Sequence, residues 1–135
     1  MVQAAVEAAG DACGVLAVTV LTSLDEEALG RVWGREITDM RGEVLRLAEL
    51  AEAAGAHGVV CSGLEAGMIR DRFGDRLATL VPGIRLAGGA RQDQSRVVTP
   101  RDAAGAGARY IVLGRAVTGS SSPADTMKQV LADLS

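Results

Sequence analysis

The feature that most constrains the fold of this chain is a unit that occurs four times. Each unit consists of a short apolar run, then a polar turn, then the start of a helix. The apolar runs are residues 15–21, 58–61, 77–81 and 110–113. Most of them are rich in β-branched residues, which favour strands. Apolar strands that alternate with helices are typical of a parallel sheet covered by helices, so we expect an α/β fold.

The polar turns carry signals for helix starts. In each turn a Ser or Thr is followed three residues later by an acid, which is the spacing of a capping box. The first turn, residues 22–26, contains this spacing, and the other pairs are Ser62 with Glu65, Thr99 with Asp102, and Ser122 with Asp125. Pro100 and Pro123 follow two of these hydroxyl residues, at the first helical position, where a missing N–H has no consequence. We therefore expect a helix to begin at each turn.

Apolar residues recur with helical spacing in three further places. Residues 43–54 and 123–134 each have one apolar stripe, and Gly55 is expected to end the first of these helices. Residues 2–9 have the same spacing, and no capping residue precedes them. Residues 30–42 contain Trp33 and three Gly and break the periodicity, so we interpret them as a loop, with or without a short helix.

The number of units indicates half of a closed barrel. A barrel of eight parallel strands and eight helices usually takes about 250 residues, whereas this chain has four units in 135 residues. Because Met1 starts inside a helical pattern, we expect a single segment, residues 1–135, that corresponds to the second half of such a (β/α)8 TIM barrel. It would contain strands five to eight with their helices and would lack the N-terminal half.

Composition excludes several classes of partner. The net charge is -3, the pI is about 5.1 and no basic block occurs, which argues against nucleic acid and anionic membranes as partners. No apolar run approaches the ~20 residues of a membrane span, and the N-terminus lacks the pattern of a secretory signal. We expect a cytoplasmic protein in which Cys13 and Cys61 are buried thiols.

In such folds the ligand lies at the carboxyl ends of the strands. The last apolar run ends in Gly114 and Arg115. Glycine allows a backbone to approach an anion closely, and arginine adds a permanent planar charge. These two residues therefore predict a phosphate-binding turn, for which the alternative is a simple tight turn with a solvated Arg115.

The loop that follows the third apolar run is also a candidate. Residues 83–96 are long for a connection of this kind and contain three Gly and three Arg. Arg85 stands directly at the end of the strand. One interpretation is a lid over an anionic ligand, and the other is a surface insertion.

Several of these segments, taken together, resemble the bacterial type of orotidine 5′-phosphate decarboxylase. The matching segments are residues 18–25, 58–62, 82–85, 93–96, 99–100 and 114–115, with Thr118. Their order and spacing fit the second half of that family's barrel. The resemblance covers essentially the whole chain, from the helix after strand four to the C-terminus.

The resemblance implies a role for five residues. Thr22 corresponds to a substrate contact at the end of strand five, and Arg85 and Arg115 correspond to phosphate ligands, together with the Gly114 amide. Gln94 corresponds to a lid residue that touches the phosphate and reaches toward the pyrimidine. Departures from the family's usual pattern concern details of the lid and occur at Val81, Leu86 and Leu64.

The resemblance also implies a reaction, the conversion of orotidine 5′-monophosphate to UMP and CO2 in pyrimidine biosynthesis, without cofactor or metal. The family's catalytic array of Asp and Lys comes from the first half of the barrel, and the only lysine here is Lys128, in the last helix. We therefore expect that this chain binds substrate but does not decarboxylate it alone. Its expected partners are an N-terminal half-barrel or a second copy of itself.

Two other functions are consistent with the sequence. The chain could be a non-catalytic half-barrel that binds phosphate or nucleotides, or part of a sugar-phosphate enzyme of the same superfamily. The missing residues of the early strands would distinguish these functions.

Overall fold

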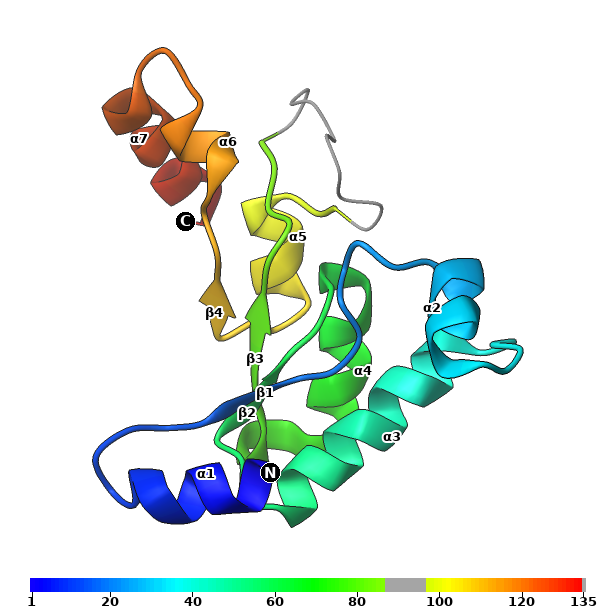
Figure 1. Cartoon of the computed structure of the whole chain (residues 1–135). Coiled ribbons are helices and arrows are strands. Elements are labelled where there is room, and N and C mark those ends of the chain that lie inside the picture. Colours follow the sequence, from blue (N-terminus) through cyan, green and yellow to red (C-terminus); the bar gives the residue numbers. More distant parts are fainter. Residues whose placement is uncertain (87–96, 135) are drawn as a thin grey trace.

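The computed structural model describes residues 1–86 and 97–134, and in them four parallel strands form one sheet. The strands are β1 (Leu16–Val18), β2 (Gly58–Val60), β3 (Ala78–Val81) and β4 (Tyr110–Ile111). They lie side by side in chain order, β1-β2-β3-β4, and every pair is parallel (Figure 1). Each strand falls inside one of the four apolar runs, so the expected α/β fold with four parallel strands is confirmed.

Helices connect the strands. In chain order the helical elements are α1 (Val2–Ala9), α2 (Glu26–Trp33), α3 (Met40–Ala53), α4 (Gly63–Phe73), the 3-10 turn η1 (Gly74–Arg76), α5 (Pro100–Gly105), α6 (Arg115–Thr118) and α7 (Pro123–Leu134). Every connection between consecutive strands contains at least one of them. In the described part of the chain no helix is long and apolar enough to cross a membrane.

The helices cover one face of the sheet. The register places Val18, Val60, Leu80 and Tyr110 in one row across the four strands. Successive side chains of a strand point to opposite faces, so Val59 points the other way. Val59 has no exposed surface, whereas 57% of Val18 is exposed. The core therefore lies between the helices and one face of the sheet, and the row faces away from it.

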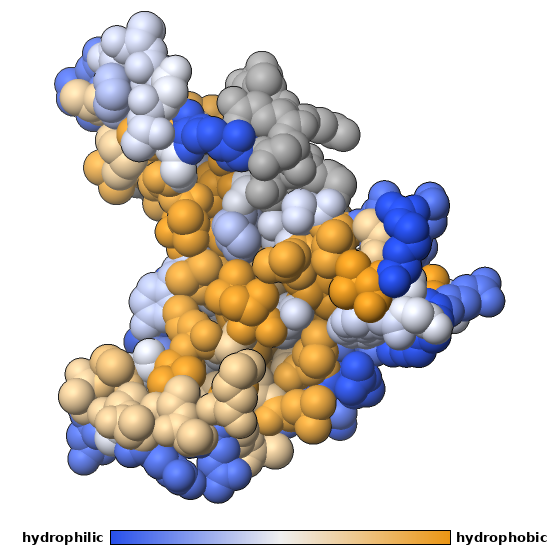
Figure 2. All heavy atoms as spheres, viewed as in Figure 1, coloured by the Kyte–Doolittle hydropathy of each residue, from blue (hydrophilic) through white to orange (hydrophobic). Residues whose placement is uncertain are grey.

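The uncovered face of the sheet is apolar. Figure 2 shows hydrophobic residues gathered over the region where Figure 1 shows the strands. On the covered face, Val44 and Ala48 of α3 and Ile69 of α4 are completely buried in the core. This arrangement is the one expected of a barrel segment, in which helices line the outside and the opposite face of the strands points inward.

Two of the predicted capping boxes are present. Ser62 and Glu65 cap α4, with the Ser62 N–H donating to Glu65 Oε2 over 2.8 Å. Thr99 and Asp102 cap α5 in the same way, and Pro100 is its first residue. At the first turn the N-cap of α2 is Asp25, which accepts from the Ala28 N–H, and not the Ser or Thr that a capping box requires.

The prediction for residues 30–42 is also partly wrong. Helix α2 continues to Trp33, and α3 already begins at Met40, capped by the side chain of Asp39. Only the residues between Trp33 and Met40 form a loop, which Gly34 opens with a left-handed conformation at φ 67°. Asp39 caps α3 ahead of the apolar stripe of residues 43–54, so this helix starts earlier than the spacing of its apolar residues indicated.

Candidate functional site

The predicted site residues that the structure describes follow the carboxyl ends of the strands. Because the four strands are parallel, their C-terminal ends lie at the same edge. Arg85 follows β3, and Gly114 follows β4, which is the neighbouring strand. The structure therefore brings the two predicted phosphate-binding segments to adjacent strands.

Gly114 and Arg115 form the turn at the end of β4. Gly114 is the N-cap of α6, and its carbonyl accepts from the backbone N–H groups of Val117 and Thr118. A Cβ placed on Gly114 would meet no atom of residues 1–86 or 97–134 within 4 Å, so these residues leave the space beside this backbone open. Gly114 and Arg115 are both exposed. The turn is therefore accessible on the side where a Cβ would stand.

Arg85 is held at the base of the long loop. Its backbone N–H donates to the carbonyl of Val98 over 3.0 Å, and Ile84 forms a parallel bridge with Val98. Ile84 is buried, and the Arg85 guanidinium donates to the Ile84 carbonyl over 2.8 Å. The two ends of the loop are thus tied together, with half-buried Arg85 just after the strand. Gln94 and the lid hypothesis lie outside the described residues and stay predictions.

Thr22 lies at the same edge of the sheet but on a more distant strand. It follows β1 by four residues and is 7% exposed. In the strand order, β2 separates β1 from β3. Thr22 therefore lies beyond the end of strand β1, at the far side of the edge from the Gly114 turn.

The carboxylates with altered acidity belong to caps and surface pairs. The pKa of Asp102 is lowered because the Thr99 side chain and backbone N–H donate to its carboxylate. The pKa of Asp125 is lowered by its hydrogen bond to Lys128 and then by the one from Ser122. Within the described residues, no group of three or more His, Cys, Asp or Glu side chains could hold a metal ion. None of these groups indicates an acid–base centre.

One polar hollow at the opposite edge of the sheet was not predicted. It lies near the amino ends of β2, β3 and β4 and is lined by residues that include Arg70, Thr79 and Arg109. These residues come from separate elements and share no local sequence pattern. Only the position of His57, just before a strand and away from the carboxyl edge, pointed to this end of the sheet.

The chain matches known proteins along almost its whole length. Residues 1–130 match the model of the "Orotidine 5'-phosphate decarboxylase / HUMPS family". The orotidine 5′-phosphate decarboxylase of Thermobifida fusca is 48% identical over 134 residues, which are 99% of this chain and 56% of that protein. The one from Nitrosococcus oceani is 44% identical over 121 residues, or 90% of this chain and 51% of that protein.

Solved structures give the same result for the fold. The crystal structure of orotidine 5′-phosphate decarboxylase from Lactobacillus acidophilus aligns with a TM-score of 0.71 at 34% identity. The alignment covers 90% of this chain and 49% of that one. The chain thus spans about half the length of the relatives it matches, and its four strands form half of a TIM barrel. By sequence and by fold, the chain belongs to the orotidine 5′-phosphate decarboxylase / HUMPS family.

Proposed function

We propose that this chain is the phosphate- and nucleotide-binding half of an orotidine 5′-monophosphate decarboxylase. Within a complete barrel it would take part in converting orotidine 5′-monophosphate to UMP and CO2 in the cytoplasm. The observation that carries the proposal is the placement of Arg85 and of the Gly114 turn on adjacent strands of one sheet edge. Arginines bind phosphate through paired, charge-assisted hydrogen bonds, which suits two basic residues around one phosphate.

The other proposed substrate contacts are those that the resemblance to the family implies. Thr22 would contact the substrate from the end of β1, and Gln94 would reach from the loop to the phosphate and the pyrimidine. The Gly114 N–H would donate to a phosphate oxygen in the open space beside it. Together with Arg85 and Arg115, these residues form the substrate-binding set of the proposal.

The catalytic groups would come from outside residues 1–135. The single lysine, Lys128, lies in α7 with 77% of its side chain exposed, and it pairs with Asp125 over 3.0 Å. A proton donor for a carbanion must reach the substrate in a site that excludes water, and an exposed surface ion pair does not meet that need. We therefore propose that the isolated chain binds nucleotide without decarboxylating it.

The proposed partner is an N-terminal half-barrel. Strands β1 and β4 each pair with one neighbour among the described strands, so both outer edges present backbone groups for pairing. The uncovered face of the sheet is apolar, with Val18, Leu21 and Val112 among its exposed large side chains near the strands. Further strands that close the barrel would satisfy these edges and cover this face. A second copy of the chain is the alternative partner.

The test is complementation. The chain would be co-expressed with the part of the Thermobifida fusca relative that precedes the matched region, and UMP formation would be assayed. We expect turnover in the reconstituted sample and none with the chain alone. An Arg115→Ala variant should lose most of the turnover, whereas Lys128→Ala should retain it.

The alternatives give different results in the same sample. Nucleotide binding without turnover after complementation would indicate a non-catalytic binder. A larger thermal shift with a pentulose phosphate than with UMP would indicate a sugar-phosphate enzyme. Decarboxylation by the purified chain alone would contradict the proposal that the catalytic groups lie elsewhere.

A further inference from the structure

A basic hollow lies at the amino edge of the sheet, opposite the edge that carries the proposed substrate site. Its volume is about 480 Å³, and the charged residues that line it include Arg70 of α4, Asp75 and Arg76 of η1, and Arg109 before β4. Three arginines against one aspartate give the hollow a positive charge, in a chain whose net charge is -3. The local field therefore has the opposite sign to that of the whole chain.

Two of these arginines have no acidic partner in the part of the chain that the structure describes. Arg76 pairs with Glu52 over 2.7 Å, and its charge is largely compensated. Arg109 lies over the ring of Tyr110, 6.0 Å from the ring centre. Arg70 lies against Gly107, where an added Cβ would come within 2.3 Å of the Arg70 Cδ. Arg70 and Arg109 are therefore positioned by packing and keep their donors for another group.

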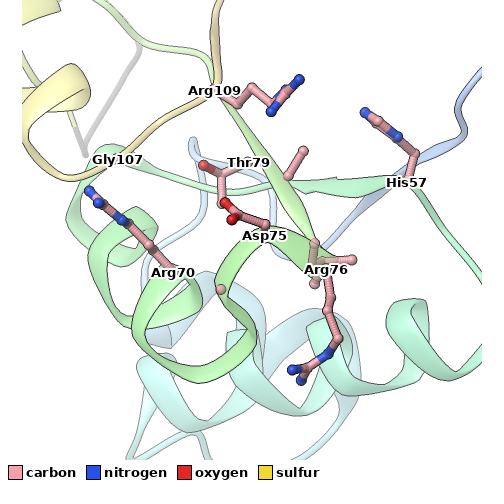
Figure 3. Close-up of a pocket in the computed structure, with 10 residues that line it drawn as sticks. His57, Arg70, Asp75, Arg76, Thr79, Gly107 and Arg109 are labelled. Carbon is pink, nitrogen blue, oxygen red and sulfur yellow. The ribbon is translucent and has the colours of Figure 1, made fainter.

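Thr79 adds a buried hydroxyl to the same hollow. It is 3% exposed, and its Oγ1 is the one buried side-chain oxygen or nitrogen of the described residues that lacks a hydrogen-bond partner. Figure 3 shows Thr79 in the middle of the hollow, between Arg70 and Arg109, with Asp75 beside it. Buried polar groups are nearly always paired with protein, water or a ligand. The Thr79 hydroxyl is therefore a donor that a ligand in the hollow can use.

We propose that this hollow binds a small oxyanion, either inorganic phosphate or the phosphate group of a small metabolite. Arg70 and Arg109 supply the charge on the two sides of Thr79, and the Thr79 hydroxyl donates to an anion oxygen. Asp75 is the single opposing charge, and it favours a ligand that also carries a hydroxyl or a protonated oxygen. Because the hollow and the proposed substrate site lie at opposite edges of the sheet, this proposal does not rest on the proposed function.

The experiment is a titration of the isotope-labelled chain with inorganic phosphate, followed by backbone amide NMR. We expect saturable shifts at the amides of Gly107 and Arg109. Shifts at the Gly114 amide would report binding at the proposed substrate site. The oxyanion proposal and the proposed function are therefore tested independently. A parallel titration with glycerol phosphate distinguishes inorganic phosphate from a phosphorylated metabolite. Whichever of the two compounds binds more tightly identifies the kind of ligand.

Variants distinguish a specific site from general attraction between charges. Arg70→Gln and Arg109→Gln should each weaken phosphate binding at the Gly107 amide at least about tenfold, as expected for the loss of a charged hydrogen bond. Thr79→Val should also weaken it. The matched control is Arg72→Gln, on the same helix, because Arg72 pairs with Glu49 over 3.0 Å and does not line the hollow. Binding to this control should be unchanged.

Two outcomes would overturn the proposal. One is the absence of saturable shifts at Gly107 and Arg109 in the unmodified chain. The other is an equal loss of binding in Arg70→Gln and Arg72→Gln, because that would show a response to net charge alone.

Discussion

Replacing Thr79 by valine should make the chain more stable. The Thr79 hydroxyl is buried without a hydrogen-bond partner among the described residues, and the residue is 3% exposed. An unsatisfied buried polar group costs about 1–3 kcal/mol, and valine has nearly the same shape without the hydroxyl. We expect Thr79→Val to raise the free energy of unfolding by roughly 1 kcal/mol. For a chain of this length the midpoint temperature would rise by about 3–4 °C.

The matched control is Thr126→Val, where the same chemical change should have the opposite sign. Thr126 is similarly buried, at 9% exposed, but its hydroxyl bonds Ser120 Oγ over 2.9 Å and the Ser122 carbonyl over 3.0 Å. Losing these bonds should lower stability by about 1 kcal/mol. Urea unfolding followed by circular dichroism measures both variants.

The comparison has a clear refuting result. If Thr79→Val lowered stability as much as Thr126→Val, the Thr79 hydroxyl would have a partner and the reasoning would fail. If the oxyanion proposal is correct, saturating phosphate should reduce the advantage of Thr79→Val, because the bound ligand stabilises only the chain that binds it.

Three further predictions concern the helix caps and the substrate site. Ser62→Ala removes one half of the capping box with Glu65 and should lower the free energy of unfolding by about 1 kcal/mol in a urea titration. Hydrogen bonds from Thr99 hold the pKa of Asp102 below its ordinary value of about 3.9. The stability that this lowered pKa contributes is present above the ordinary pKa and is lost as the pH falls through the pKa of Asp102 in the folded chain. In the Thr99→Val variant, NMR titration should find the pKa of Asp102 raised toward its ordinary value. Arg115→Ala should weaken UMP binding at least about tenfold by calorimetry, and unchanged affinity would refute its proposed role.

The elements that were predicted well are those with local signals. The four apolar runs located all four strands, and the spacing of Ser62 with Glu65 and of Thr99 with Asp102 located the starts of two helices. Each strand is shorter than its apolar run, because regular parallel pairing with the neighbouring strand covers only part of the run. In β4, for example, this pairing covers Tyr110 and Ile111, and the Val112 N–H adds one further bond to the Val81 carbonyl.

The features that were predicted wrongly depend on contacts that the local sequence pattern does not determine. Asp25, and not a Ser or Thr of the same turn, is the N-cap of α2, and the spacing alone does not distinguish the two. Cys61 is buried as expected, but Cys13 is exposed, contrary to the expectation. Cys13 follows the end of α1 in a connecting turn, and composition carries no information about the packing of such a turn.

The candidate site was predictable where it follows directly from a strand end. Arg85 and Arg115 stand within a few residues of β3 and β4, and parallel pairing alone brings those ends together. The hollow at the other edge was not predictable. Arg70 and Arg109 are 39 positions apart, and only the packing of Arg70 against Gly107 brings them to one place.

The order of the strands has a consequence for how the chain opens. Because β1, β2, β3 and β4 follow one another in the sheet as they do in the sequence, each strand depends only on the units before and after it. Stability then spreads by nearest-neighbour coupling, as it does in repeat proteins. Amide hydrogen exchange should be slowest in β2 and β3 and fastest in β1 and β4, so that the sheet frays from both sides toward its centre. Further strands that pair with β1 or β4 would extend the sheet without changing the order of the existing strands. The strands that exchange fastest would then be the added ones.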